Sequence, residues 1–326
     1  MDYTLEFEKP VLDLETQIKE LQESNDKAGI DISNEIKALQ KKVDKMINEI
    51  YGNLSSWERV QLSRHPKRPH TVDYIEAMIA DFHELHGDRR FYNDKSMITG
   101  FGYFRGQKVA IIGIEKGRKT QDRIERNFGM ASPEGYRKAI RIMKLASNFN
   151  IPIISFVDTP GAYPGIGAEE RGQAQAIAEN LEEMFGIKVP MIAVVIGEGG
   201  SGGALGVAIT DKVFMMEYSI YSVISPESCA SILWSDPKQA EFAANSLQLG
   251  PKKALELGII DGTIQEPVGG AHKDLDGAVT NISDVIEREL KILMKKSEVE
   301  LLNDRFEKFR GMGNQTISTI KDTPSE

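Results

Sequence analysis

The stretch Val189–Val207 reads VPMIAVVIGEGGSGGALGV, and its character changes at Gly197. Its first half is apolar and rich in β-branched residues, which is typical of a buried strand. In its second half, five of the seven residues from Gly197 to Gly203 are glycine, which predicts a tight turn that enters a helix. Because glycine lets the backbone itself approach a ligand, this turn offers peptide N–H groups to an anion or to a developing oxyanion.

A dinucleotide site is one alternative interpretation of this turn. Gly197, Gly199 and Gly202 match the G-x-G-x-x-G fingerprint, and Glu217 lies close to the expected acidic position about 20 residues on. The fingerprint normally opens a nucleotide-binding domain, whereas this turn lies past the middle of the chain.

A serine hydrolase and a purely structural glycine turn are two further alternatives. Gly199, Ser201 and Gly203 match the G-x-S-x-G nucleophile elbow, which requires an acid and then a histidine later in the chain. Asp261 and His272 could complete such a triad. From the residues alone, all these interpretations stay open.

A second transition from strand to glycine loop lies about 40 residues earlier. The apolar run that starts at Ile151 ends in DTPGAYPG, Asp158–Gly165, and a predicted helix over Glu169–Phe185 separates the two transitions. Strand, helix and strand at this spacing predict a right-handed βαβ unit, whose two loops emerge at the same edge of the sheet. Each loop can then supply an N–H donor, which is what an oxyanion hole requires.

The composition indicates a soluble cytoplasmic protein. The net charge of −9 argues against general affinity for nucleic acid. The single cysteine, Cys229, excludes an intrachain disulfide, suits a reducing compartment and is expected to be a buried apolar residue. No run reaches the roughly 18 apolar residues of a membrane span, and the histidines lack metal-ligand spacing, so we expect neither a membrane nor a metal.

The chain divides into four predicted regions. Residues 1–64 carry apolar residues at heptad spacing and predict a helical hairpin that serves as an interface; residues 65–280 form the core, residues 281–310 a C-terminal helix, and residues 311–326 a polar tail. Within the core, Thr71 is expected to cap a helix that carries Phe82 on its apolar face, and Ile98–Ile114 to form a β-hairpin.

The segment Glu115–Arg126 holds five basic residues, including Lys116. A solvated charged helix is the simplest interpretation of this pattern. The alternatives are a cationic surface for a carboxylate, a phosphate or an acidic carrier domain, and weak binding of nucleic acid.

Four long motifs, in order along the chain, carry a resemblance to a known family. They are NFGM and PEGYRK between Asn127 and Lys138, DTPGAYPGIGAEERGQ over Asp158–Gln173, IGEGGSGGAL over Ile196–Leu205, and YSVISPE over Tyr221–Glu227. Together they resemble the carboxyltransferase alpha subunit of bacterial acetyl-coenzyme A carboxylase.

The resemblance implies an α/β fold of the crotonase/ClpP-like type, a spiral of repeated ββα units flanked by helices. It also implies an α2β2 carboxyltransferase whose beta subunit is a separate chain that carries the zinc. The reaction transfers the carboxyl group to acetyl-CoA from carboxybiotin, which is attached to the biotin carboxyl carrier protein. Its product is malonyl-CoA, which is used in fatty acid synthesis. ATP is used by the partner biotin carboxylase. Another acyl-CoA as acceptor and a crotonase-superfamily hydrolase are the alternatives.

The resemblance also implies which negative charge the two glycine loops stabilise. This charge develops on the ureido oxygen of biotin when the carboxyl group leaves. Gly202 and Gly203 are expected to be the main donors to this oxygen, with Gly161 as the donor from the other loop. Four further residues are expected on the carboxybiotin side: Gly199, Gly200, Ala162 and Tyr163. Glu198 and Ser201 are expected to be structural or polarising, because the released biotin can itself take the methyl proton.

Overall fold

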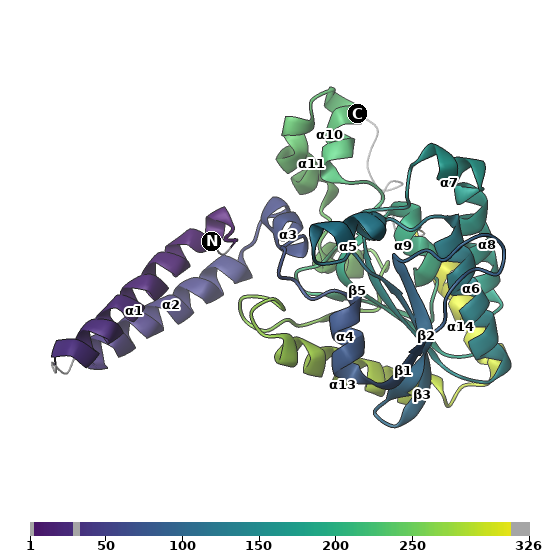
Figure 1. Cartoon of the computed structure of the whole chain (residues 1–326), viewed down its shortest axis with the longest axis horizontal. Helices are drawn as coiled ribbons and strands as arrows, with labels where there is room; N and C mark the ends of the chain where they lie inside the picture. Colours follow the sequence, from purple (N-terminus) through teal and green to yellow (C-terminus); the bar gives the residue numbers. More distant parts are fainter. Residues whose placement is uncertain (1–2, 29–32, 314–326) are drawn as a thin grey trace, which may run out of the picture.

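The structure is a computed structural model that describes residues 3–28 and 33–313 (Figure 1). Residues 29–32, between the two predicted N-terminal helices, and most of the predicted polar tail lie outside these residues. No helix within the described ranges is long and apolar enough to cross a membrane.

The described residues form one eight-stranded mixed sheet, in the order β1-β2-β3-β4-β5-β6-β8, with β7 paired to β5. The first three strands pair antiparallel, and all later pairs are parallel. The strands are β1 (Ile79–Glu84), β2 (Met97–Phe104), β3 (Gln107–Ile114), β4 (Ile153–Thr159), β5 (Met191–Gly200), β6 (Lys212–Met216), β7 (Ile220–Ser222) and β8 (Gly262–Ile264). The predicted β-hairpin is therefore confirmed as β2 and β3.

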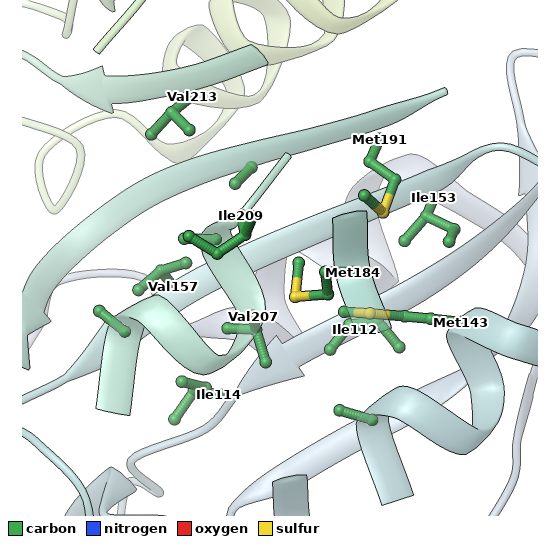
Figure 2. Packing of buried hydrophobic residues seen from close by; sticks show 14 of the residues in the cluster. Ile112, Ile114, Met143, Ile153, Val157, Met184, Met191, Val207, Ile209 and Val213 are labelled. Atoms are coloured by element: carbon green, nitrogen blue, oxygen red, sulfur yellow. The ribbon is translucent and has the colours of Figure 1, made fainter. Parts of the chain in front are cut away.

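Helices cover both faces of the sheet, so the central strands are buried on both sides. On one face lie α6 (Pro133–Asn148), α8 (Gln173–Phe185) and α9 (Ser201–Ala208), and Figure 2 shows Met143, Met184 and Val207 packed against the strands there. On the other face lie α4 (Thr71–Met78) and α13 (Leu275–Leu293). Alternate residues of one strand serve the two cores: Ile112 belongs to the first and Ile111 to the second.

The remaining helices surround this sandwich. They are η1 (Glu6–Glu8), α1 (Lys9–Ala28), α2 (Ser33–Gly52), α3 (Ser56–Ser63), α5 (Thr120–Glu125), η2 (Asn127–Gly129), α7 (Ile166–Glu170), α10 (Pro226–Trp234), η3 (Pro237–Gln239), α11 (Ala240–Leu247), α12 (Pro251–Glu256) and α14 (Glu298–Gly311). Figure 1 shows α1 and α2 projecting from the body as a hairpin, as predicted, and α10 and α11 standing together beyond the sheet.

The hairpin has its own narrow apolar seam, in which Val11, Ile18 and Val43 are buried. It joins the body through Tyr51, which packs with Tyr218 and donates a 2.5 Å hydrogen bond to Glu8. The seam follows the heptad pattern of the sequence.

Several predicted helix boundaries are wrong because local capping decides them. Thr71 does not cap α4; its hydroxyl donates to the carbonyl of Ile114, and the carboxylate of Asp73 accepts the N–H of His70 at the helix start. The helix then ends at Met78, so Phe82 lies on β1. The helix predicted over Glu169–Phe185 divides at Gly172, whose φ of +80° is left-handed.

The C-terminal region holds two helices, where a single helix was predicted. Ser297 breaks the pattern because it caps α14, and Glu300 completes the capping box. This second helix places Arg305 in the interior: its guanidinium pairs with Asp211 at 2.9 Å and donates to the carbonyls of Met184 and Ile187, each at 2.7 Å. Helix α14 is thereby anchored to the middle of the chain.

Candidate active site

The two glycine loops meet at the carboxyl ends of β4 and β5, as predicted. These strands are parallel neighbours, and Thr159 pairs with Gly199 at their ends. A β-carbon at residue 203 would lie 2.5 Å from the carbonyl carbon of Gly161 and 2.6 Å from the nitrogen of Ala162. A β-carbon at Gly200 would likewise collide with the carbonyl oxygen of Pro160. Only glycine at both positions lets the loops approach backbone to backbone.

The glycine run itself is more extended than predicted. Strand β5 continues to Gly200, and Glu198–Gly200 pair with β7, so the tight turn expected after Ile196 is absent. The ring of Tyr221 on β7 occupies the space where a β-carbon of Gly199 would stand. A dinucleotide fingerprint needs a turn at its first glycines, so this geometry does not support a dinucleotide site.

The helix that follows, α9, presents its first N–H groups toward the meeting point of the loops. These groups have no acceptor within an α-helix, and Gly200, the N-cap residue, has no side chain that could accept from them. Gly202 and Gly203 are the second and third residues of this helix, so their N–H groups are candidate donors. Gly203 is buried and Gly202 is partly exposed.

Two of the N–H groups in the first loop already have acceptors. The N–H of Gly161 donates to the hydroxyl of Thr159 at 3.1 Å, and the N–H of Tyr163 donates to the carbonyl of Ala131 at 3.0 Å. Among the described residues, the N–H of Ala162 has no acceptor, and it lies beside Gly203. Ala162 is therefore better placed as a donor than Gly161, whose N–H must first leave Thr159.

The alternative triad of Ser201, Asp261 and His272 is not assembled. Ser201 follows the carboxyl end of β5. Asp261 precedes the amino end of β8, which is parallel to β5, and it pairs with Lys308 at 2.8 Å. The ring of His272 packs on His65, with 4.1 Å between centroids. Ser201 has a strained φ of +50°, but no base or acid of this triad lies beside it.

A buried ionic cluster underlies both loops, and the sequence analysis missed it. The ammonium group of Lys116 lies 2.7 Å from Asp158 and 2.6 Å from Glu198, the residues at which the two loops begin. On its other side, Glu198 pairs with Arg64 at 2.5 Å, and Arg64 also pairs with Glu227 of α10. Five charged groups therefore connect the loops to α3 and α10.

The cluster keeps its charges despite its burial. Burial acts to raise the pKa of Glu198, but Lys116 and Arg64 outweigh it and lower that pKa to about 2. Burial acts to lower the pKa of Lys116, and the carboxylates of Asp158 and Glu198 raise it above its ordinary value. The expected structural role of Glu198 agrees with these contacts.

The charged helix predicted over Glu115–Arg126 is therefore wrong for Lys116. Only Thr120–Glu125 is helical, and Lys116 lies between β3 and α5 with its side chain inside the protein. Arg118 pairs with Asp73, and Arg126 with Asp122, so much of the cationic charge of this segment is neutralised. This pairing weakens the case for a nucleic-acid surface.

The groove beside the loops is small. Its cavity volume is about 10 Å³, and its walls include Arg64, Pro160, Gly199, Gly200 and Ser225. Sites that enclose a small molecule usually measure about 300–1,000 Å³. This groove is therefore too small to enclose such a molecule. Within these residues, no group of three or more His, Cys, Asp or Glu side chains is arranged to hold a metal ion.

Several solved structures share the fold of this chain. Transcarboxylase 12S matches 71% of this chain and 43% of its own, with a TM-score of 0.57 and 19% identity. The Pseudomonas malonate decarboxylase hetero-tetramer contains a chain that matches 71% of this chain and 90% of its own, with a TM-score of 0.55 and 14% identity. The likeness to these structures shows that the chain shares their fold.

Sequence comparison then gives the family. Residues 4–313 match the family described as acetyl co-enzyme A carboxylase carboxyltransferase-like. The carboxyl transferase subunit alpha of acetyl-coenzyme A carboxylase from Staphylococcus aureus (strain bovine RF122 / ET3-1) is 51% identical over 310 residues, 95% of this chain and 99% of that protein. The corresponding subunit of Geobacter metallireducens is 52% identical over 312 residues, 95% of this chain and 97% of that protein. The chain belongs to the family of acetyl-CoA carboxylase carboxyltransferase alpha subunits, and the predicted resemblance is confirmed.

Proposed function

We propose that this chain contributes half of a composite active site that transfers a carboxyl group from carboxybiotin, on a biotin carboxyl carrier protein, to acetyl-CoA. The product is malonyl-CoA for fatty acid synthesis. One observation carries the proposal: Gly203 lies against the backbone of Gly161 and Ala162, so unpaired N–H groups from two loops converge. Such convergence suits an oxygen that gains negative charge during a reaction.

The catalytic contribution of the chain is electrostatic. Biotin supplies the carboxyl group and, once released, a basic site for the methyl proton. The N–H groups of Gly202, Gly203 and Ala162 then donate to the ureido oxygen of biotin, and Gly161 can join them if its N–H leaves Thr159. Each such donor typically lowers the barrier by about 3–4 kcal/mol in a site that excludes water. Gly199 and Gly200 bring the second loop up to the first. Tyr163 lines a neighbouring cavity with Ser132 and Arg171, outside the groove at Gly199 and Gly200, and we assign it to the carboxybiotin side through its place in the first loop.

The second half of the site is proposed to come from a beta subunit in an α2β2 assembly, and zinc is assigned to that subunit. The small groove supports this proposal, since the described residues enclose too little space for the substrate. So does an apolar surface on and beside α10 and α11, which we call the α10–α11 surface; it comprises Val223, Ile232, Leu233, Trp234 and Phe242. Ile232 is 71% exposed and Phe242 58%, and exposed apolar surface of this kind marks protein contacts.

The remaining proposals follow from the family. Biotin carboxylase uses ATP to load the carrier, and all the components act in the cytoplasm. We assign residues 1–64 as an interface region, 65–280 as the carboxyltransferase core, 281–310 as a C-terminal helical region and 311–326 as a tail. We also infer that the sheet belongs to a crotonase-like spiral of ββα units. The unit formed by β2, β3 and α6 supports this inference.

The test is reconstitution. The chain mixed with a beta subunit should form malonyl-CoA from acetyl-CoA and carboxybiotin, and the chain alone should not. Substantial transfer by the single chain would contradict the composite site. A strong preference for another acyl-CoA would identify a different acceptor, and fluorophosphonate labelling of Ser201, with loss of activity in Ser201→Ala, would favour the hydrolase.

A further inference from the structure

Three neighbouring parallel strands each deliver one charged residue to the base of the two loops. Lys116 follows β3, Asp158 lies near the end of β4, and Glu198 lies near the end of β5. The exposed fraction of each side chain is below one tenth: 9% for Lys116, 2% for Asp158 and 7% for Glu198. One ammonium group therefore bridges two buried carboxylates.

From this arrangement we propose that Lys116 is a positioning residue that fixes the two oxyanion loops against each other. The proposal rests on the function proposed above. Asp158 stands three residues before Gly161, and Glu198 stands five residues before Gly203. The Oδ1 atom of Asp158 accepts both from Lys116 at 2.7 Å and from the N–H of Glu198 at 2.9 Å, so the start of each loop is tied to the other.

The surrounding backbone is shaped to admit this contact. A β-carbon at Gly197 would collide with the carboxylate of Asp158. A β-carbon at Gly129 would lie 2.7 Å from the Cγ atom of Lys116 and 3.0 Å from the carbonyl oxygen of Asp158. The two glycines thus clear space for the lysine and for its partner.

Lys116 acts through the loops because its ammonium group is enclosed. Nζ donates to both carboxylates and lies under the loops with its side chain nine-tenths buried. A reacting atom above the loops contacts the backbone N–H groups, while the lysine sets where those groups stand. Positional errors of about 1 Å in such a site can cost roughly 100-fold in rate.

In a variant without the ammonium group of Lys116, the carboxylates of Asp158 and Glu198 both face the position that this group occupied. Arg64 still pairs with Glu198, while Arg68 and Tyr74 are the other ionisable groups near Asp158. Neither replaces the bridge, since Arg68 is engaged with Glu266 at 2.6 Å. Two carboxylates this close favour the uptake of one proton, because protonation removes their repulsion. The proton can then form a hydrogen bond between the two carboxyl groups and so replace the bridge that Lys116 made.

The experiment compares Lys116→Met with the wild-type chain, each reconstituted with a beta subunit. At pH 8 we expect kcat to fall at least 30-fold while KM for acetyl-CoA changes less than threefold. Between pH 8 and pH 6 the ratio of variant to wild-type kcat should rise at least fivefold, because the carboxylates acquire their shared proton. The double variant Lys116→Met/Glu198→Gln should recover at least fivefold at pH 8, since it removes the repulsion.

A second measurement does not depend on activity. Amide hydrogen exchange of residues 159–163 and 199–203 should be faster in Lys116→Met than in the wild-type chain at pH 8, and should slow again in the double variant. Lys138→Met is the matched control: Lys138 is buried and donates to Asn93 and to the carbonyl of Asp94, so its loss should not speed exchange in these loops.

Each outcome decides a different claim. Unchanged kcat and unchanged loop exchange in Lys116→Met would overturn the positioning role, as would a loss that neither acid nor Glu198→Gln reverses. A wild-type complex without carboxyl transfer would refute the proposed function instead, and the exchange of the loops would still decide whether Lys116 positions them.

Discussion

The α-carbon of Gly203 faces the peptide between Gly161 and Ala162 so closely that a β-carbon at residue 203 would lie 2.5 Å from the carbonyl carbon of Gly161. This contact joins residues 42 positions apart in the sequence, counted from 161 to 203. It brings a helix start against a loop with no side chain between them. The donors of the proposed site are therefore held by main-chain packing, and the first prediction tests that packing.

Gly203→Ala should lower kcat for carboxyl transfer by about 100-fold or more, because the loops must separate to admit the methyl group and the donors move apart. Gly202→Ala should lose much less, since its β-carbon would meet only Ile177 at 3.6 Å. Gly186→Ala, where the nearest atom is the carbonyl oxygen of Glu183 at 3.5 Å, controls for loss of a glycine as such. Equal activity in all three variants would remove the close approach from the mechanism.

Acidification should destabilise the chain through His65. Burial and the neighbouring His272 lower the pKa of His65 to about 4, and its Nδ1 accepts the backbone N–H of Lys67, which requires that atom to be unprotonated. Because the folded pKa is depressed, the stabilisation is complete above the unfolded pKa of about 6.5 and is lost as the pH falls toward 4. We expect the free energy of unfolding to fall by up to about 3 kcal/mol over this range.

Urea unfolding at pH 7, 6, 5 and 4 measures this slope. In His65→Gln the pH dependence between 6.5 and 4 should flatten, whereas His86→Gln, which changes an exposed histidine, should keep it. The same slope in the wild-type chain and in His65→Gln would assign the acid sensitivity to other groups.

Arg305→Met should destabilise the fold by about 3–5 kcal/mol, because it leaves Asp211 charged and unpaired in the interior. The double variant Arg305→Met/Asp211→Asn should regain part of this loss, since the charge is then removed. Arg310→Met changes a side chain that is 70% exposed and should alter the free energy of unfolding by less than about 0.5 kcal/mol. Chemical denaturation decides between these values, and a small effect of Arg305→Met would show that the interior tolerates the unpaired carboxylate.

Phe242→Glu should weaken assembly with the beta subunit at least tenfold without lowering the melting temperature of the free chain. The ring of Phe242 is 58% exposed and packs edge-on against Trp234 on the α10–α11 surface. Phe149→Glu is the control, since Phe149 is 68% exposed at the end of α6, away from the glycine loops. Titration by sedimentation or light scattering gives the affinities, and equal weakening by both variants would exclude a specific role for the α10–α11 surface.

The sequence could predict those parts of the fold that local pattern controls. The apolar β-branched run ending at Ile196 specified β5, the turn at Gly106 specified the β2–β3 hairpin, and the spacing of the two glycine loops specified parallel neighbours. In each case a few adjacent residues determine the backbone. The convergence of Gly203 with Gly161 followed from this topology.

Other features depend on contacts between distant segments, which local pattern does not contain. Lys116 resembled a surface residue because its neighbours are charged, yet its two carboxylate partners lie near the ends of strands that begin 37 and 75 positions later, counted from 116 to 153 and 191. Its place after β3, beside β4 in the parallel order, was the available signal. The hydrogen bond from the N–H of Gly161 to the hydroxyl of Thr159 is likewise a contact that the sequence pattern does not show.

The anchoring of Arg305 also sets an order of events during synthesis. Asp211 and Arg305 are separated by 94 positions, and the carbonyls that Arg305 binds belong to residues that leave the ribosome earlier still. The segments that form β5 and both glycine loops are therefore synthesised before the guanidinium group that pairs with Asp211. The carboxylate of Asp211 gains its guanidinium partner only after α14 has been synthesised, so a chain truncated before α14 should carry an unpaired carboxylate at residue 211 and be more readily degraded by proteases.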